Sequence, residues 1–434
     1  MKSILKLRRL ALLASTLALV LLASNALQSG VGDKNYAEIY PPVICPAVGN
    51  GTNSQISLNS SSKMVRSLYK KRVSLKPAKT TRLLTNTNSI LVDGQGVNAL
   101  TWISKAGVWA GGVTCLSPQA SQYLVGASAD VASKSNLILS NSGLSASTVD
   151  VMIFSDNNLI EKQVAVPANR TISIPLVTLA PGAKTIAMKV APKAGRVAAY
   201  LVDERGKGLT SLGGDVVNSQ AELAKTLYIP AVAHTLSLQK SHVLRILNPN
   251  SAKTNITVEL LSNNGRYIPV GFDYRSVNAD RVVDLTFDFD SKTPVFGMKI
   301  TSDLPIAAAT FSRVKPGSKA DFVWSTPVPA GVTGTWAVTG LDPTLAVTGA
   351  EIELSLRILM PKRKSIEKTL TGSDFLTYRL PTGALGLQIR SSGNENAAAL
   401  IVSSQSGTGY LPLINGSILA RSTVPTANIG VLNP

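Results

Sequence analysis

Histidine and cysteine are scarce in this chain, and their scarcity excludes several kinds of chemistry. The 434 residues include two histidines, His234 and His242, and two cysteines, Cys45 and Cys115. The metal-binding spacings H-E-x-x-H and C-x-x-C are absent from the sequence. A Ser-His-Asp triad needs a histidine beside an activated serine, and no G-x-S-x-G elbow is present. We therefore expect no catalytic residues, no metal site and no cofactor.

Charge is also sparse, because Asp, Glu, Lys and Arg make up only 16% of the residues. Ordinary soluble domains contain about 25%. A glycosidase needs two carboxylates across a cleft, and the notable local acidic cluster is Asp284, Asp288 and Asp290. These side chains alternate along one segment, where they could also bind Ca²⁺. We favour the simpler interpretation, a solvated outer face.

The N-terminal 26 residues have the three parts of a secretory signal. Four cations precede a mostly apolar run from Leu10 to Ala23, and Ser24 and Ala26 fit a cleavage site. The run is shorter than the ~20 residues that span a bilayer, which favours cleavage over a retained anchor. We expect an extracytoplasmic protein, secreted or bound to the cell envelope, that contacts a membrane only if this segment is retained.

The two cysteines of an exported protein usually form a disulfide. A Cys45–Cys115 bond would close a loop of about 70 residues, which the chain-entropy model values at ~4 kcal/mol. Two free thiols are the alternative.

Short apolar segments separated by Gly, Asn and Pro predict β-strands throughout the chain. In residues 282–290, Val283, Leu285, Phe287 and Phe289 alternate with polar side chains, so each strand should bury one face. We expect an all-β fold of tandem immunoglobulin-like or fibronectin-like β-sandwich units. One short helix is expected at residues 220–227.

An internal repeat suggests how the chain is divided. A strand, a polar turn and a second strand occur at residues 137–153 and again at 243–261, with a weaker match near 351–356. The expected parts are a signal peptide (1–26), a disulfide-tied N-terminal region (27–120) and three sandwich units (121–225, 226–330 and 331–434).

Positive charge is in excess, with a net charge of +18, and it is densest in one acid-free stretch. Such charge attracts polyanions, or it serves only solubility. The candidate polyanion-binding residues are Lys63, Arg66, Lys70, Lys71, Arg72, Lys76, Lys79 and Arg82, with a smaller cluster at Lys362, Arg363 and Lys364. The four tryptophans are candidate sugar-stacking platforms, although core positions are the simpler interpretation.

Several local motifs resemble a known family. Cys115 is followed by Pro118, residues 123–126 read Tyr-Leu-Val-Gly, and a Leu-x-Leu-x-Asn strand ends at Asn141. The second unit contains Leu-Asn-Pro-Asn at 247–250 and Ser-Asp-Leu-Pro-Ile at 302–306. Over about residues 40–430 the chain resembles an uncharacterised family of large secreted actinobacterial proteins, a domain of unknown function. The resemblance implies an envelope-facing protein of unsettled role and supplies no catalytic residues.

Together these observations predict a non-enzymatic envelope protein that scaffolds or binds wall polymers or partner proteins. Export argues against nucleic acid as a partner. The alternatives are an enzyme acting on envelope glycans, which would need a pocket with two or more buried carboxylates, and a surface adhesin that uses exposed strand edges.

Overall fold

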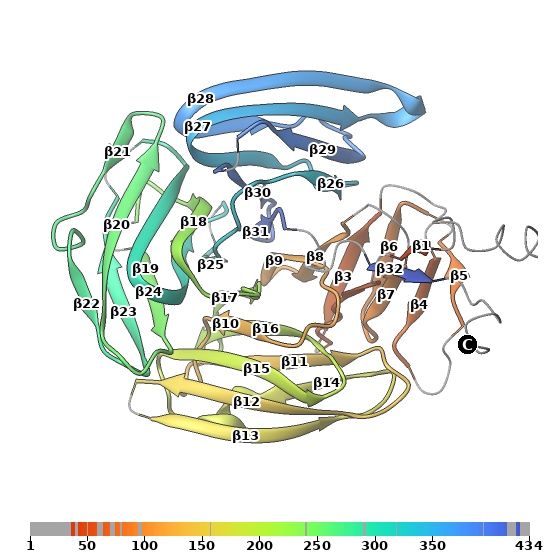
Figure 1. Ribbon diagram of the computed structural model, residues 1–434, viewed down its shortest axis with the longest axis horizontal. Helices are drawn as coiled ribbons and strands as arrows, with labels where there is room; N and C mark the ends of the chain where they lie inside the picture. The colour runs from red at the N-terminus through yellow and green to blue at the C-terminus, as the bar shows by residue number, and fades with distance from the viewer. Residues whose placement is uncertain are drawn as a thin grey trace, which may run out of the picture. The chain divides into compact units, whose positions relative to one another are not determined.

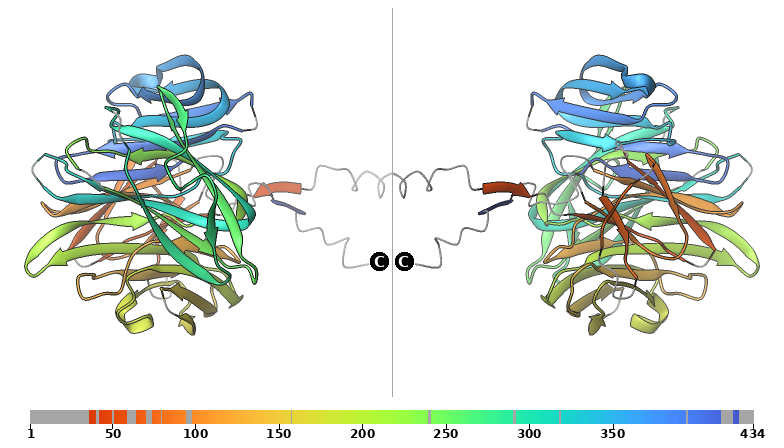
Figure 2. Two further views of the ribbon diagram at one scale, coloured as in Figure 1. Left: turned by 90° about the vertical axis from the view of Figure 1, so that its left-hand side faces the viewer. Right: turned by 90° about the vertical axis from the view of Figure 1, so that its right-hand side faces the viewer.

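The structure is a computed structural model. It describes residues 36–39, 42–49, 51–58, 64–69, 74–78, 80–93, 98–156, 158–238, 241–289, 292–317, 319–393, 395–414 and 422–425. These residues form an all-β fold, as expected, and Figures 1 and 2 show strands along almost all of the described chain. The expected signal peptide lies outside the described residues. Within them, no helix has the length and hydropathy needed to cross a bilayer.

The chain divides into two compact units. Residues 1–40 and 421–434 form the first unit, in which β1 (Tyr36–Ile39) pairs antiparallel with β32 (Ser422–Pro425). The second unit comprises residues 41–420 and contains all the other described strands.

Two four-stranded antiparallel sheets open the second unit. The first sheet has the order β2 (Val43–Cys45), β7 (Ile90–Asp93), β4 (Met64–Ser67), β5 (Lys76–Pro77). The other has the order β6 (Arg82–Thr85), β3 (Thr52–Ser57), β8 (Leu100–Lys105), β9 (Trp109–Thr114).

A second pair of sheets follows along the chain. One sheet has the order β10 (Gln122–Val125), β15 (Ile186–Ala194), β12 (Ser147–Ser155), β13 (Leu159–Val166). The other has the order β14 (Arg170–Pro175), β11 (Asn136–Asn141), β16 (Ala198–Lys207), β17 (Thr210–Val217), and the short helix α2 (Leu176–Leu179) follows β14. Strands at the same place in the two pairs of sheets differ in number by eight, so the second pair repeats the topology of the first.

The third set of strands is joined by one long strand, β24 (Val295–Val314). Its first half pairs with β18 (Ala224–Ala233) and β20 (Thr254–Ser262), and its second half with β19 (His242–Asn248) and β25 (Asp321–Ser325). The outer strands are β21 (Gly265–Tyr267) and β22 (Arg275–Val277), which pair with β20, and β23 (Arg281–Phe287), which pairs with β19.

The last set is a six-stranded sheet built on a long hairpin. The strands β27 (Thr344–Leu359) and β28 (Ser365–Arg379) are joined by the 3-10 turn η2 (Pro361–Arg363). Beside β27 lie β29 (Gly386–Ser391), which also pairs with β26 (Gly334–Ala337), and β30 (Ala397–Ser403), which also pairs with β31 (Thr408–Pro412).

Alternation of side chains builds each core. In β12, Val149, Val151 and Ile153 are fully buried, whereas the residues between them are only partly buried. They share one core with Leu137 and Leu139 of β11, a strand of the facing sheet. Each such side chain contributes roughly 1.5–3 kcal/mol by leaving water, so the paired sheets are held together mainly by apolar packing.

Four edge strands, one from each set, meet in the second unit. Strand β9 contacts β17 and β31, and β25 contacts the same two strands, so the four contact one another in a cycle (Figure 1). Side chains bond across these contacts to the backbone of the next strand. Thr114 Oγ1 donates to the Pro412 carbonyl at 2.7 Å, and Asn218 Oδ1 accepts the Thr114 N–H at 2.9 Å.

Glycine permits this close approach. A Cβ on Gly111 of β9 would lie 2.1 Å from Asp215 Oδ1, and one on Gly213 of β17 would lie 2.4 Å from Asp321 Oδ1. Real Cβ atoms do not approach other heavy atoms so closely, so β9, β17 and β25 fit together only because these two positions carry no side chain.

The helix expected at residues 220–227 is wrong. Leu227 lies in β18, and Gln220 makes an isolated bridge to Tyr123 through two backbone hydrogen bonds of 2.8 Å. The apolar run Leu227–Ala233 is buried throughout, which suits a strand covered on both faces and hides any alternation. The expected division into a disulfide-tied region and three repeated units stays a prediction.

Candidate functional site

The larger of two pockets described here lies between the third and fourth sets of strands. Its volume is about 1020 Å³. Its lining comes from strand ends and the loops beyond them: the end of β18, the loop between β24 and β25, the end of β28, and the connection from β30 to β31. Loops on a sheet scaffold are where binding residues concentrate, because they tolerate varied side chains.

The charged lining of this pocket is cationic. Lys315 and Lys319 lie in the loop after β24, and Arg379 ends β28. Lys319 donates to the Gly107 carbonyl at 2.8 Å, which fixes the loop to the β8–β9 turn. No aspartate or glutamate is among the described lining residues. A group with negative charge is therefore attracted here without a competing carboxylate.

Hydroxyl groups make up much of the remaining lining. They belong to Thr235, Thr293, Thr344, Thr377, Ser403, Ser404 and Thr408. Phe375, which is 4% exposed, and Ile401 supply apolar surface. On β28, Phe375, Thr377 and Arg379 stand at every second position, so one strand face carries all three to the pocket. Hydroxyls, an aromatic ring and cations together suit a hydroxylated, anionic ligand such as an acidic sugar or a polyol phosphate.

Both histidines of the chain meet at the edge of this pocket. His234, a lining residue after β18, has its Nδ1 3.0 Å from Nε2 of His242, the first residue of β19. The other ring nitrogen of His242 lies 2.9 Å from Ser312 Oγ. Burial, and secondarily the charge of His234, lowers the pKa of His242 to about 3, so this ring is neutral at physiological pH.

This constellation does not form a nucleophilic triad. Ser312 is 0% exposed, so its hydroxyl cannot reach a bound substrate. The contact with Ser312 orients the ring of His242, and His242 in turn orients the ring of His234. His234 is therefore the histidine that a ligand in the pocket can contact.

A model of a family of unknown function (DUF5719) matches residues 78–365, about two-thirds of the chain. The chain belongs to this family. The DUF5719 match includes Lys315, Lys319 and both histidines of the pocket but ends before Arg379. No curated protein matches the chain. Among solved structures, the crystal structure of Thermotoga maritima 1070 is 12% identical, with coverage of 24% of this chain and 97% of that chain and a TM-score of 0.22.

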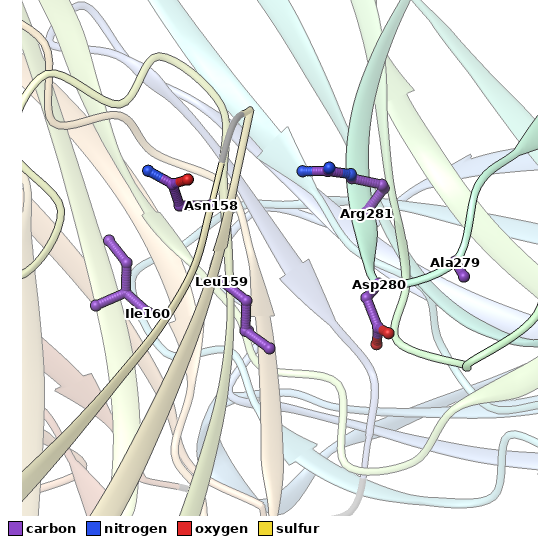
Figure 3. Close-up of a pocket in the computed structure, with 6 residues that line it drawn as sticks. All are labelled: Asn158, Leu159, Ile160, Ala279, Asp280 and Arg281. Atoms are coloured by element: carbon purple, nitrogen blue, oxygen red, sulfur yellow. The ribbon is translucent and has the colours of Figure 1, made fainter.

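The second pocket of this DUF5719 protein is smaller, about 490 Å³. Asn158, Leu159 and Ile160 at the start of β13 face Ala279, Asp280 and Arg281 at the start of β23 (Figure 3). Its lining contains one acid, Asp280, and one base, Arg281. The charged lining of the larger pocket, in contrast, has a single sign.

Three buried carboxylates, none of them a lining residue of either pocket, lie near the point where β9, β17, β25 and β31 meet. Asp203, Asp215 and Asp321 are at most 3% exposed. Asp321 accepts the Gly214 N–H at 3.1 Å and the Thr408 N–H at 3.3 Å, which joins β25 to β17 and β31. Burial raises the pKa of Asp321 to about 7. Burial, with the charges of the other two aspartates, also raises the pKa of Asp215 well above its ordinary value.

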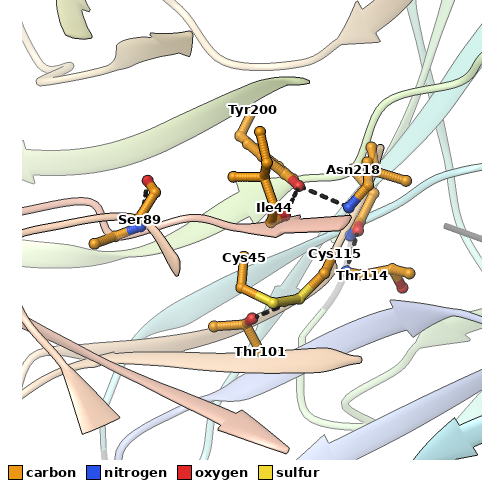
Figure 4. Close-up of a disulfide and its surroundings, with 10 residues drawn as sticks. Ile44, Cys45, Ser89, Thr101, Thr114, Cys115, Tyr200 and Asn218 are labelled. Carbon is orange, nitrogen blue, oxygen red and sulfur yellow. Dashed lines mark hydrogen bonds between the residues drawn. A yellow bond between two sulfur atoms is a disulfide. The ribbon is translucent and has the colours of Figure 1, made fainter. Parts of the chain in front are cut away.

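Cys45 and Cys115 are joined by a disulfide, as expected from the sequence. The bond ties β2 to the chain just after β9, beside Thr101 (Figure 4). Next to it, the buried Tyr200 hydroxyl donates to the Ile44 carbonyl at 2.5 Å and accepts the Leu116 N–H at 2.9 Å. The disulfide therefore belongs to the packing between the first two sets of strands.

The basic stretch of residues 63–82 is described only in part. Lys63, Lys70, Lys71, Arg72 and Lys79 lie outside the described residues. Of the others, Lys76 is exposed on β5, Arg66 donates to Asn169 and to the Ser142 carbonyl, and Arg82 donates to Gln55. Two of the three described cations thus bond to the protein itself, and polyanion binding by this stretch stays a prediction.

Asp284, one of the three residues of the acidic cluster, pairs with a buried arginine. Arg245 of β19, 3% exposed, makes a bidentate ion pair of 2.7 and 2.8 Å with Asp284. It also donates to the carbonyls of Ala127 and Ile186 in the second set of strands. Asp290 lies outside the described residues. Of the four tryptophans, Trp109, Trp324 and Trp336 are buried, which leaves only the partly buried Trp102 as a candidate for stacking.

Sequence reasoning missed the pocket because its cations are far apart along the chain. Three whole strands, β25, β26 and β27, and most of β28 separate Lys315 from Arg379, and neither residue lies in the densest basic stretch. No local sequence pattern brings these cations and the two histidines together, because their proximity depends on how the strands pack.

Proposed function

We propose that this protein is a non-enzymatic, extracytoplasmic component of the cell envelope that binds an anionic glycan or polyol-phosphate polymer. The observation that carries the proposal is the 1020 Å³ pocket, whose charged lining is cationic and whose remaining polar lining is mostly hydroxyl groups. Charge-assisted hydrogen bonds from Lys and Arg recognise phosphate and carboxylate groups. Neutral hydroxyls satisfy the hydroxyls of the ligand.

Two features support the location. Residues 1–26 have the pattern of a secretory signal. The Cys45–Cys115 disulfide suits an oxidising compartment, because reducing systems keep cytosolic thiols free. The actinobacterial envelope, implied by the resemblance of the sequence motifs, belongs to this proposal.

An enzyme acting on envelope glycans is the alternative with less support. Such chemistry requires two carboxylates facing a bound sugar. Among the described lining residues, the larger pocket has none and the smaller pocket has Asp280 alone. A surface adhesin is a further proposal. In that case a partner protein would pair with β13, which is an exposed strand at the edge of its sheet.

Binding of defined polymers tests the proposal. Poly(glycerol phosphate) and polygalacturonate serve as anionic probes, and dextran serves as the neutral control, in isothermal titration at low and high salt. We expect both anionic probes to bind, binding to weaken with salt, and dextran to bind at least tenfold more weakly. Equal binding of dextran, or no binding of either anionic probe at low salt, would refute the proposal.

Substitution of the pocket cations locates the binding. The double variant Lys315→Gln, Arg379→Gln should weaken both anionic probes about tenfold, since it removes two charge-assisted contacts at a partly exposed site. Lys162→Gln, Lys207→Gln removes two exposed cations elsewhere and is the matched control. An equal loss in both variants would mean that net charge, and not the pocket, attracts the polymer.

A further inference from the structure

The hairpin formed by β27 and β28 carries cations at both of its ends. Arg379, at the end of β28, lines the pocket. At the opposite end, the turn presents Lys362, Arg363 and Lys364, all exposed. These three residues are in no ion pair with a described carboxylate. The pocket and the turn are therefore two separate cationic centres on one structural element.

The turn itself is unusual in its choice of residues. Lys362 and Arg363 both have a φ of 59°, in the left-handed region. Tight hairpin turns that need positive φ at two positions generally use Asn-Gly or Asp-Gly, which adopt it at little cost. A bulky residue in that conformation costs about 1–2 kcal/mol. Two long cations occupy a position where small residues would form the turn more easily, which indicates a role for their charge.

The face of β28 between the two cationic centres is lined with hydroxyls. Leu370 and Leu376, at even positions, pack into the core of the last sheet. The odd positions point away from that core, and those in the pocket are Thr377, Arg379 and Phe375, which is buried against the third set of strands. The remaining odd positions that carry hydroxyls are Ser365, Thr369, Thr371 and Ser373, and all four are exposed. The single odd-numbered acid, Glu367, is 3.3 Å from Arg357, which offsets its charge.

The length of the strand sets the size of the ligand. From Ser365 to Arg379 there are fourteen residue steps, or roughly 45 Å at 3.3 Å per residue. We propose that the ligand is a linear polyanion at least this long, which lies along β28 with one part in the pocket and another against the turn at Lys362–Lys364. This proposal rests on the proposed function and extends it, because it makes the ligand a polymer that two linked sites hold at once.

Two linked contacts predict a dependence on chain length. A short anion reaches only the pocket, whereas a long chain gains the second contact as an intramolecular step and binds 10²-fold tighter or more. Tripolyphosphate is the short probe and long-chain polyphosphate the long probe, both measured by isothermal titration per mole of chain. The test variant is Lys362→Gln, Arg363→Gln, Lys364→Gln, and the matched control is Lys162→Gln, Lys207→Gln, Lys253→Gln, which removes the same charge from exposed sites elsewhere.

The expected result is specific to the long probe. The turn variant should bind tripolyphosphate like the unmodified protein and bind long-chain polyphosphate at least tenfold more weakly, with a smaller loss in the control. The variant Lys362→Asn, Arg363→Gly removes charge and relieves the turn, so it should show the same loss without a lower unfolding midpoint.

Unchanged long-chain affinity in the turn variants would overturn the inference and leave the pocket standing. So would equal affinity of the unmodified protein for both probes. If neither probe binds to the unmodified protein, the proposed function and this inference fail together.

Discussion

The buried carboxylate of Asp321 makes stability depend on pH in a direction that the structure fixes. The unfolded chain releases this proton near pH 3.8, and the folded protein retains it until about pH 7. Between these values the folded state binds more protons, so stability falls as pH rises. The difference between these two pKa values corresponds to a loss of about 4 kcal/mol across the window.

Replacement by asparagine separates this effect from the rest of the protein. Asp321→Asn keeps the size of the side chain and cannot ionise. Its amide has one acceptor oxygen, so it can accept the N–H of Gly214 or of Thr408 but not both, and this loss is the same at every pH. Urea unfolding at half-unit steps from pH 4 to pH 8, with the disulfide intact, gives the free energy of unfolding of both proteins. The difference between them reports Asp321 together with its effect on the pKa of Asp215, because ionisable groups that do not interact with Asp321 titrate alike in both proteins.

We expect the unmodified protein to lose stability relative to Asp321→Asn by about 1.4 kcal/mol per pH unit between about pH 4.5 and 6.5, with no further change above pH 7.5. A difference that stays constant from pH 4 to pH 8 would refute the reasoning. So would a relative gain in stability as the pH rises, since that would mean that the backbone N–H groups outweigh burial.

Three further substitutions test the packing. Replacing Cys45 and Cys115 with serine should lower the free energy of unfolding by about 4 kcal/mol, because it releases a loop of about 70 residues; denaturant unfolding checks this, and an unchanged midpoint would contradict it. Gly111→Ala should cost about 1–3 kcal/mol, since its Cβ would lie 2.1 Å from Asp215 Oδ1, whereas Gly372→Ala, at an exposed site where the nearest heavy atom would lie 3.4 Å from the Cβ, should cost less. Arg245→Met should cost about 1–3 kcal/mol by removing a buried donor from the carbonyls of Ala127 and Ile186, and thermal unfolding at neutral pH measures the loss.

The strand content of the fold was predictable from side-chain alternation, which Val149, Val151 and Ile153 show clearly. The positions at which strands continue or end were not predictable from this pattern. Residues 302–305, Ser-Asp-Leu-Pro, suggest a turn, yet they lie inside the 20-residue strand β24. The proline is tolerated there because the strand changes partners at this point, so a missing N–H interrupts no continuous ladder.

The pocket was less predictable than the fold, for a physical reason. Its residues occupy strand ends whose proximity depends on how the third and fourth sets of strands pack, and no local pattern encodes that packing. The contact between His234 and His242 illustrates this limit. The sequence shows two isolated histidines eight positions apart, and only the return of the chain from β18 to β19 brings their rings together.

The bond between Thr114 and the Pro412 carbonyl joins residues 298 positions apart in the chain. Strand β31, which supplies this carbonyl, contacts both β9 and β25, so the central strands cannot complete their packing until almost the last described segment of the second unit has been synthesised. Contacts of such long range form late and slow the final step of folding. The second unit therefore gains its full stability only near the end of its own synthesis.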